Sequence, residues 1–413
     1  MGKVERARRI LIYSHDSFGL GHLRRCRAMA NSLVEQNQNL SVLILSGSPI
    51  IGSFDFKARV DFVRIPGIIK LRNGEYTSLS LHIDTEQTLA MRASIIRHTA
   101  EIFDPDIFIV DKEPYGLRGE VTETLQMLKD RGTHLVLGLR DVLDDPSLLG
   151  PEWERKNVMP ALENLYHDIW IFGVEQIFNP LNGLEIPSRV KRKITYTGYL
   201  PRAVPTATEP AIMSEMTEPY VLITVGGGGD GDVLIDWALR AYESETRPPL
   251  NALVVLGPFM PPEVRAGFRD RINKLDRVRA VTFDSHLESL MEGASAVVAM
   301  GGYNTFCEIL SMDKRALIIP RTIPRLEQYI RASRAAEAGL IGVLIDDDHR
   351  ADETMMTALR QLAQQKKPSE TIIPGLLDGL KNLNRLVRLR FKAVDKRKIA
   401  MRKNPNSKAE AIS

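Results

Sequence analysis

A histidine that follows a short apolar run and a glycine-rich turn is the first residue whose type and place could support catalysis. The run Ile10–Tyr13 predicts a strand, and Gly19 and Gly21 lead from it to His22. Glycine lets the backbone approach an anion closely, and the N–H groups that begin the next helix attract negative charge. A neutral imidazole with a pKa near ~6.5 suits proton abstraction at cellular pH. The competing interpretation is a structural turn with a solvated histidine.

Four consecutive glycines form a second corner, after the apolar run Tyr220–Val225. They are Gly226, Gly227, Gly228 and Gly229. Glycine loses more conformational freedom on folding than other residues, so a use for bare backbone beside phosphates explains this stretch best. A flexible loop is the alternative. Dinucleotide binding of the GxGxxG type is disfavoured, because no acidic residue ends the next strand-like run.

A helix led by two glycines forms the third corner and carries the most specific pattern. Backbone N–H groups at the start of such a helix, together with a hydroxyl, can hold a diphosphate. The residues expected to do so are Gly302, Tyr303, Asn304 and Thr305. Glu308 follows on the same helical face, where its carboxylate could accept from two ribose hydroxyls. The pattern predicts a nucleoside diphosphate site, and the alternative is a helix cap with a surface glutamate.

The segment 293–340 resembles glycosyltransferase family 28 of the GT-B superfamily, which includes the UDP-N-acetylglucosamine transferase that forms lipid II. The resemblance implies that Thr305 holds the diphosphate and Glu308 the ribose. It also implies that Glu327 and Gln328 reach the hydroxyls of the donor sugar, and that the glycine loop 226–229 approaches the phosphates. Glu327 departs from the family pattern, which usually has Gln at that place.

The amino-terminal corner carries a second resemblance. Gly19, Gly21, His22 and Arg25 form the pattern GxGHxxR, which is similar to that of the UDP-sugar hydrolase of pseudaminic acid synthesis. That enzyme has the same fold and would use its histidine to activate water. In family 28 the corresponding histidine is the proposed base. The segment 46–111 matches neither pattern, so the acceptor stays open.

The predicted fold class is α/β of the GT-B type, with two Rossmann-like domains whose parallel sheets face a central cleft. Strand-like runs alternate with helix-like segments in two series, separated by a proline-rich break. The predicted parts are an acceptor-side domain with the base at 1–200, a linker at 201–219, a nucleotide-sugar domain at 220–375 and a basic helix and tail at 376–413. Ligands of open α/β sheets bind at the carboxyl ends of the strands. We therefore expect the site in the cleft.

These features predict an inverting, metal-independent glycosyltransferase that moves a sugar from a nucleoside-diphosphate donor, a UDP-sugar by resemblance. The acceptor would be a hydroxyl of a cell-envelope or polysaccharide molecule. His22 would take the acceptor proton, while helix N–H groups and the glycine loop stabilise the leaving diphosphate. Arg25 and Arg321 are candidates for the same task, and Asp111 is expected to face the cleft with an open role. The nucleotide sugar is a substrate, so no cofactor is expected.

Metal sites and disulfides are not expected. The two cysteines, Cys26 and Cys307, lack ligand spacing. Asp104 and Asp106 have the DxD spacing of metal-dependent transferases, but they precede an apolar run and so predict a turn that enters a strand. Arg140 with Asp141 is interpreted as an ion pair at the cleft edge.

We expect a cytoplasmic protein, because the sequence shows neither a signal-peptide pattern nor a membrane-spanning run. Of its 413 residues 44% are hydrophobic, and the apolar runs fall well short of the ~20 residues of a membrane-spanning helix. Residues 377–413 hold eleven Lys or Arg against three Asp or Glu. The first part of this tail is expected to pack on the first domain. From Lys396 onward we expect disorder or peripheral contact with the inner face of the plasma membrane.

Other functions stay open on the same scaffold. A nucleotide-sugar hydrolase or epimerase would use the same donor residues, with water or no second substrate in place of an acceptor. A non-catalytic protein that binds a nucleotide sugar is the third alternative. Nucleic acid is not an expected partner, since the net charge of +3 comes from the tail.

Overall fold

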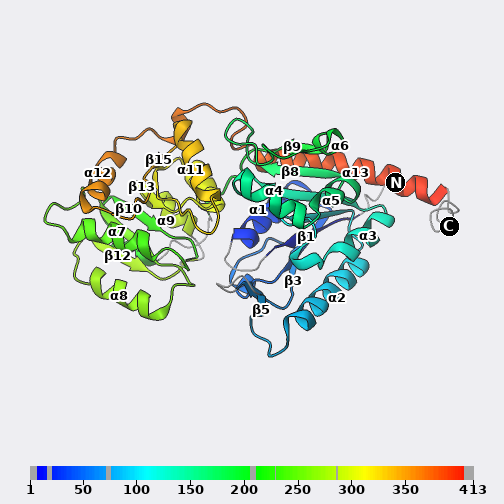
Figure 1. The fold of residues 1–413 in the computed structure, drawn as a ribbon, viewed down its shortest axis with the longest axis horizontal. Coiled ribbons are helices and arrows are strands. Elements are labelled where there is room, and N and C mark those ends of the chain that lie inside the picture. Colours follow the sequence, from blue (N-terminus) through cyan, green and yellow to red (C-terminus); the bar gives the residue numbers. More distant parts are fainter. Residues whose placement is uncertain are drawn as a thin grey trace.

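The structure is a computed structural model that describes residues 7–15, 21–70, 76–204, 211–227, 229–284 and 287–403. Two α/β domains lie side by side, each built on one parallel sheet (Figure 1). The predicted fold class is confirmed. Two of the predicted site residues, Gly19 and Gly228, lie outside the described residues.

A seven-stranded parallel sheet in the order β3-β2-β1-β6-β7-β8-β9 forms the first domain. Its strands are β1 (Arg8–Ser14), β2 (Leu40–Ser46), β3 (Val60–Arg64), β6 (Ile107–Asp111), β7 (His134–Arg140), β8 (Asp168–Phe172) and β9 (Ile194–Tyr196). A small antiparallel pair joins β4 (Ile68–Lys70) to β5 (Tyr76–Ser78). The described helices are α1 (Gly21–Gln36), α2 (Thr85–Phe103), α3 (Thr122–Asp130), α4 (Pro146–Arg155), α5 (Val158–Asn164) and α6 (Ser188–Lys191), with short 3-10 turns at Ile51–Ser53 and Leu117–Gly119.

Helices cover both faces of this sheet because successive side chains of each strand point to opposite faces. In β1, Ile10 and Ile12 pack in one core with α1. Leu11 packs in a second core with Leu125 of α3. The strand is apolar on both sides, so the sheet is a buried middle layer and only its edges and strand ends can carry function.

A six-stranded parallel sheet in the order β12-β11-β10-β13-β14-β15 forms the second domain. Its strands are β10 (Tyr220–Thr224), β11 (Asn251–Val255), β12 (Val278–Val281), β13 (Ala296–Ala299), β14 (Arg315–Ile318) and β15 (Gly342–Val343). The described helices are α7 (Asp232–Glu243), α8 (Pro262–Ile272), α9 (Leu287–Gly293), α10 (Tyr303–Ser311), α11 (Glu327–Glu337) and α12 (Asp352–Leu362), with 3-10 turns at Ala211–Glu215 and Pro368–Glu370. In both domains the central strands point their carboxyl ends toward the cleft between the domains.

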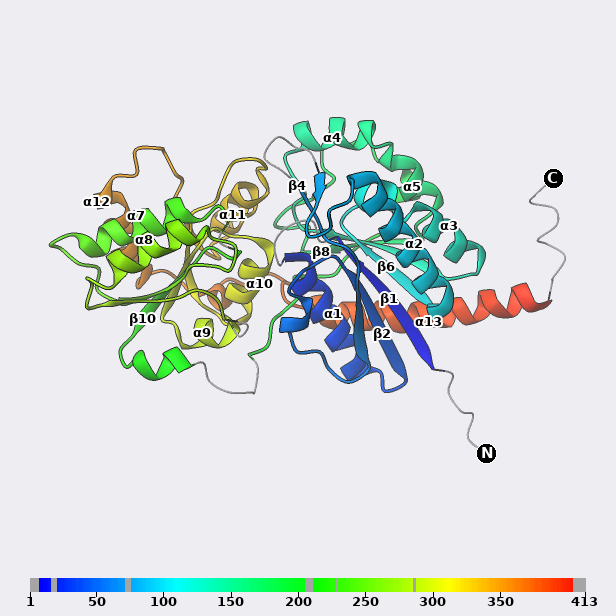
Figure 2. The same cartoon turned by 90° about the horizontal axis from the view of Figure 1, so that it is seen from below.

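The last helix, α13 (Gly379–Lys403), returns to the first domain and runs along it beside α1 (Figure 2). Leu383 and Val387 are fully buried in the core that α1 shares. Asp168, at the start of β8, accepts hydrogen bonds from Arg390 Nε at 2.6 Å and Nη2 at 2.9 Å. Its Oδ2 also lies 2.6 Å from Nε2 of His134. None of the helices in the described ranges is long and apolar enough to cross a membrane.

Asp168→Asn should loosen α13 from the first domain. The carboxylate is only 5% exposed, and the neutral amide would leave Arg390 without its charge partner. We expect the unfolding free energy of this domain to fall by about 2–4 kcal/mol in urea titrations followed by circular dichroism. Asp395→Asn, which breaks the more exposed pair with Arg8, is the matched control and should cost about 1 kcal/mol or less. Equal losses in the two variants would contradict this view of α13.

Candidate active site

A cleft of about 1400 Å³ lies between the domains and is lined by residues of both. On the first domain its wall includes His15 after β1, Lys112 after β6 and Arg140 at the end of β7. On the second domain it includes Val225 after β10 and Met300 after β13. Loops that follow parallel strands release the chain from the sheet, so their polar groups are available to a ligand.

His22, in the first turn of α1, forms a dyad with Asp111 at the end of β6. Nδ1 of the ring contacts Oδ2 of the carboxylate directly. Arg25, one turn further along α1, donates to the same carboxylate from Nε at 2.9 Å and from Nη2 at 2.7 Å to each oxygen. Arg25 and Asp111 are both buried to 1% exposure, whereas 15% of the His22 side chain stays exposed and lines the cleft. The helix turn therefore carries a buried ion pair with an imidazole at its open edge.

Burial and the neighbouring charges set the protonation states of Asp111 and of the His22 ring. Burial alone would raise the pKa of Asp111, but Arg25 and His22 hold it well below its usual range. Burial lowers the pKa of His22, and Asp111 opposes this only in part. The carboxylate is thus ionised and the ring neutral at pH 7. An ionised carboxylate accepts the Nδ1 proton, which leaves the Nε2 lone pair available as a base.

Arg25 has partners other than the diphosphate for which it was a candidate. Its guanidinium is bonded to Asp111, and its Cζ lies 5.3 Å from the ring centroid of Tyr303. The phenol ring of Tyr303 is 3% exposed and also lies 5.7 Å from Cζ of Arg331. The side chain of Arg25, almost fully buried in the cleft wall, therefore supports the dyad and the start of α10.

The start of α10 presents bare backbone to the cleft. Gly302 occupies the N-cap position without a side-chain cap, and a Cβ placed there would meet nothing within 4 Å. Gly301 has a φ of +80°, and a Cβ there would lie 2.6 Å from Ile318. Thr305 lines the cleft one turn into the helix. The first N–H groups of a helix carry partial positive charge, so this end of α10 suits an anion.

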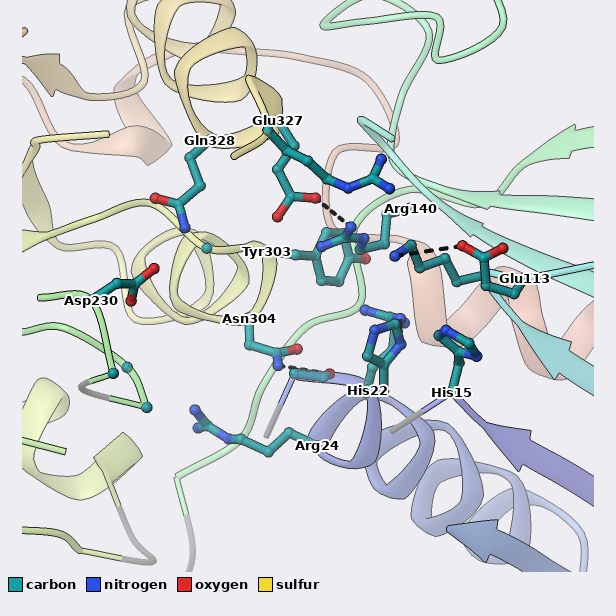
Figure 3. Close-up of a pocket in the computed structure, with 18 of the residues that line it drawn as sticks. His15, His22, Arg24, Glu113, Arg140, Asp230, Tyr303, Asn304, Glu327 and Gln328 are labelled. Carbon is teal, nitrogen blue, oxygen red and sulfur yellow. Dashed lines mark hydrogen bonds and ion pairs between the residues drawn. The ribbon is translucent and has the colours of Figure 1, made fainter. Parts of the chain in front are cut away.

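Asn304 has a structural contact that the sequence did not predict. Its Nδ2 donates to the backbone oxygen of Gly21 at 2.9 Å, and its Oδ1 accepts from Arg202 Nη2 at 2.9 Å. The side chain thus ties the start of α10 to the start of α1 (Figure 3). The two helix ends that carry the predicted chemistry are held next to each other.

The glycine loop after β10 also reaches the cleft. Gly226, Gly227 and Gly229 line it, and Gly226 has a φ of +64° with open space where a Cβ would be. Arg321 crosses to this loop and pairs with Asp230. Its guanidinium is 31% exposed and lines the cleft, so of the two candidate arginines it is the one at the surface.

Glu308, the predicted ribose ligand, is buried and does not line the cleft in this arrangement of the domains. The side chain has no exposure, and Arg24 of α1 pairs with it, with Nη2 2.6 Å from Oε1. The same nitrogen lies 2.9 Å from Oε1 of Glu288 in α9. Arg24 lines the cleft while Glu308 lies behind it. The reason is tertiary: the first turn of α1 is pressed against α10.

Two carboxylates therefore share one arginine, and their pKa values separate. Burial raises the pKa of Glu308 to about 7, and the charge of Glu288 adds to the effect. Burial would also raise the pKa of Glu288, but Arg24 takes it below its usual range. Since one guanidinium cannot neutralise both acids, Glu308 is the acid that holds a proton near neutral pH.

Glu327 and Gln328 begin α11 and line the cleft near the loop after β14. Glu327 pairs with Arg140 of the first domain. Burial is outweighed by Arg140 and Arg331, which lower the pKa of Glu327 to about 2. Oε1 of Gln328 accepts from the backbone N–H of Arg321 at 3.3 Å, so its amide nitrogen remains for a ligand.

Arg140 and Asp141 do not pair with each other at the cleft edge, which corrects the interpretation from sequence. Asp141 accepts from Arg331 Nε and Nη2, both at 2.7 Å, with both side chains only 1% exposed. Arg331 also donates to the backbone oxygen of Gly301 at 3.1 Å. Each member of the adjacent pair thus binds an oppositely charged residue of the second domain.

Asp104 and Asp106 lie at the amino end of β6, the end opposite the cleft. Asp104 ends α2 with a φ of 42°, and Asp106 accepts from the backbone N–H of Arg9 at 3.2 Å. Across the described ranges, no group of three or more His, Cys, Asp or Glu side chains is arranged to hold a metal ion.

Sequence reasoning gave no role in the site to His15, which it interpreted as a structural or surface histidine, or to Arg24, and both line the cleft. His15 directly follows β1, so its place at a strand end was an available signal. Arg24 gains its importance from a contact between the domains, and no local pattern shows it.

Comparison with known proteins agrees with this geometry. Residues 221–373 match the glycosyltransferase family 28 C-terminal domain. A calicheamicin glycosyltransferase is 14% identical with a TM-score of 0.58, over 96% of this chain and 99% of that chain. The chain has the GT-B fold. Its second domain matches the family 28 glycosyltransferase model.

Other GT-B structures align over similar lengths. The glycosyltransferase VinC in complex with dTDP is 16% identical with a TM-score of 0.58, over 94% of this chain and 100% of that chain. MurG of Acinetobacter baumannii is 13% identical with a TM-score of 0.55, over 92% and 99% of the two chains. No curated protein sequence matches the chain. At these low identities the GT-B structures establish the fold of the chain. The assignment of its site depends on the residues of this chain.

The pKa of Glu308 gives a testable dependence of stability on pH. Its folded pKa of about 7 exceeds the unfolded value near ~4.3, so the folded protein holds a proton that the unfolded chain releases. The bound proton therefore contributes to the unfolding free energy in full below the unfolded pKa, and this contribution is lost as the pH rises through about 7. Glu308→Gln should therefore remove a decline on the order of 2–3 kcal/mol between pH 5 and 7.5, measured by urea unfolding.

Glu288→Gln is the matched control on the same arginine. It removes the charge that balances Arg24, so we expect a loss of about 2–4 kcal/mol at pH 7.5. A larger loss in Glu308→Gln than in Glu288→Gln at pH 7.5 would show that the charges are assigned the wrong way round.

Proposed function

We propose that the protein is an inverting, metal-independent glycosyltransferase that moves a sugar from a nucleoside-diphosphate donor to an acceptor hydroxyl. The observation that carries this is the His22–Asp111 dyad, which lines the same cleft as the uncapped start of α10. A base and an anion site on opposite domains are what transfer from a diphosphate requires. The cleft of about 1400 Å³ has room for an acceptor beside the donor, which favours transfer over hydrolysis.

The donor diphosphate would lie at the start of α10. Backbone N–H groups at Gly302, Tyr303 and Thr305, with the glycine loop at 226–229, would surround it. Arg321, at the cleft surface beside that loop, adds positive charge. VinC was solved as a complex with dTDP, which supports a nucleoside diphosphate as the donor class. We take UDP as the donor nucleotide on the family 28 domain.

Ribose binding at Glu308 requires an exchange of partners. The carboxylate now pairs with Arg24, so the ribose hydroxyls must take the place of that guanidinium. Arg24 starts from the first turn of α1, close to the start of α10, and would turn toward the diphosphate. Arg24 would thereby exchange its contact with Glu308, which holds a proton near neutral pH, for a phosphate, while it keeps its ion pair with Glu288.

The reaction follows from these positions. His22 Nε2 takes the proton of the acceptor hydroxyl as its oxygen attacks the anomeric carbon. The bond from that carbon to the diphosphate oxygen breaks from the opposite face, and its electron pair stays on the diphosphate. Preorganised N–H donors at such a group contribute roughly 3 kcal/mol each. Glu327 and Gln328 would bind the sugar hydroxyls, and neither a metal nor a cofactor takes part in a step.

The acceptor is proposed to be a glycan or lipid-linked molecule of the cell envelope. The residues of the first-domain wall of the cleft support this class of acceptor. That wall holds His15 next to the base, and it also includes Tyr115 and Lys156. Polar and aromatic groups of this kind suit a hydroxyl-rich acceptor more than an apolar one.

His22→Ala should abolish transfer while donor binding persists. The base contributes roughly 100-fold to 10,000-fold, and Asp111→Asn should show much of the same loss because the ring is then held in the wrong tautomer. Transfer of labelled sugar from UDP-sugars to cell lipid and glycan extract measures the activity. In the wild type the transfer rate should fall only as the pH drops through the pKa of His22. Burial lowers this pKa below 6.5. Persistent transfer in His22→Ala would remove the residue from this role, and free sugar formed without acceptor would indicate hydrolysis.

The ribose contact can be tested with nucleotides alone. Thermal shifts with UDP and 2′-deoxy-UDP should show that the wild type prefers UDP, by about 10-fold in affinity, because a carboxylate without its hydroxyl partner is costly. Glu308→Gln should lose most of this preference while its binding of 2′-deoxy-UDP changes little. Glu288→Gln should keep the preference for UDP. Equal binding of both nucleotides by the wild type would place the ribose elsewhere.

A further inference from the structure

A second imidazole stands beside the base in the cleft wall. His15 follows β1, is 7% exposed and lines the same cleft as His22. The ring centroids of the two histidines are 5.6 Å apart, with an interplanar angle of 82° (Figure 3). The transfer reaction described above places His15 in the acceptor wall but assigns no contact to its Nε2.

Hydrogen bonding determines which nitrogen of His15 carries the proton. Tyr13 Oη lies 2.5 Å from Oε1 of Glu120, which Arg92 holds with two bonds of 2.6 Å. A carboxylate so paired accepts only, so Tyr13 donates its proton to Glu120. The phenol oxygen then accepts from the backbone N–H of Leu117 at 3.1 Å and from Nδ1 of His15 at 3.3 Å.

This arrangement leaves Nε2 of His15 as a lone-pair acceptor. The phenol has one proton and donates it to Glu120, so its oxygen can only accept from Nδ1 of His15, and Nδ1 is the protonated nitrogen. Burial lowers the pKa of His15 well below its usual range, so the ring stays neutral at pH 7. No residue in the described ranges forms a hydrogen bond with Nε2.

His22 has the same tautomer as His15. Its Nδ1 donates to a buried carboxylate and its Nε2 is an acceptor, as it is in His15. Each Nδ1 is committed to its own partner, which excludes a proton relay between the two rings through those nitrogens. The wall thus offers two neutral acceptors to hydroxyl groups, although deprotonating one nucleophile needs only one.

We propose that Nε2 of His15 accepts a hydrogen bond from a second hydroxyl of the acceptor, so that the acceptor carries two neighbouring hydroxyl groups. A sugar or another polyol fits this pair of imidazoles, whereas an isolated alcohol would leave His15 without a partner. The inference rests on the proposed function, because it assigns the acceptor class to the same site.

Two variants of His15 separate hydroxyl binding from a structural role. Asn places its amide near Nδ1 and can keep the bond to Tyr13, but it presents nothing at the position of Nε2. Gln reaches the position of Nε2 and can accept there, but it loses the bond to Tyr13. A role in acceptor binding makes His15→Asn the more damaging change, and a purely structural role makes His15→Gln the more damaging one.

The probes are trans-1,2-cyclohexanediol and cyclohexanol, added to the full-length protein labelled with ¹⁵N in histidine. At pH 7 the spectrum of the wild type should show His15 with a protonated Nδ1 and a bare Nε2. The diol should shift the Nε2 resonance and bind at least 10-fold more tightly than cyclohexanol. His15→Gln should keep that ratio, measured through the His22 resonances, and His15→Asn should bring it close to one.

Several outcomes would overturn the inference. They are a ring protonated at Nε2, equal affinity for the two probes in the wild type, no shift with either probe, or a greater loss of the ratio in His15→Gln. Thermal shifts with UDP in the same samples report on the donor site separately. Discrimination of the diol without UDP binding would reject the proposed function alone, and UDP binding without discrimination would reject only the role of His15.

Discussion

A carboxylate buried at the end of the central strand β6 is the constraint on which the site depends. A charge without solvent must be paired, and Asp111 is paired by Arg25 and His22 from one face of α1. The pairing sets where α1 begins relative to the sheet and orients the imidazole with Nε2 toward the cleft, while burial keeps the ring neutral. It also brings Gly21 within hydrogen-bonding distance of Asn304, so the base and the start of α10 are positioned together.

Charged pairs across the cleft give the two domains their relative arrangement. Asp141 with Arg331 is fully buried, and Arg24 with Glu308 and Arg140 with Glu327 lie nearer the cleft. The two acids expected to contact the donor thus each lie against an arginine of the first domain. Donor binding would exchange these partners instead of creating new buried charges, which limits its desolvation cost. A buried pair such as Asp141 with Arg331 can persist while the outer pairs change.

Local patterns were sufficient for the fold and for the backbone of the site. Apolar runs of strand length alternating with helical segments predicted two parallel sheets, because strands buried on both faces cannot alternate with polar residues. Glycines after strands marked the turns at Gly226 and Gly301, where a positive φ disfavours other residues. Contacts of long charged side chains were less predictable. Arg140 and Asp141 are adjacent in the chain, yet each pairs with a residue of the other domain.

The sequence by itself determined the α/β class, the strand ends that meet the cleft, and the residues His22 and Gly302 as candidates for base and anion site. Strand periodicity and glycine placement are short-range properties, so they can be seen without the fold. Tertiary structure alone decided that Asp111 orients His22, that Arg24 covers Glu308, and that His15 stands beside the base. These contacts join residues far apart in the chain, and their geometry depends on how helices and domains pack, which no local spacing encodes.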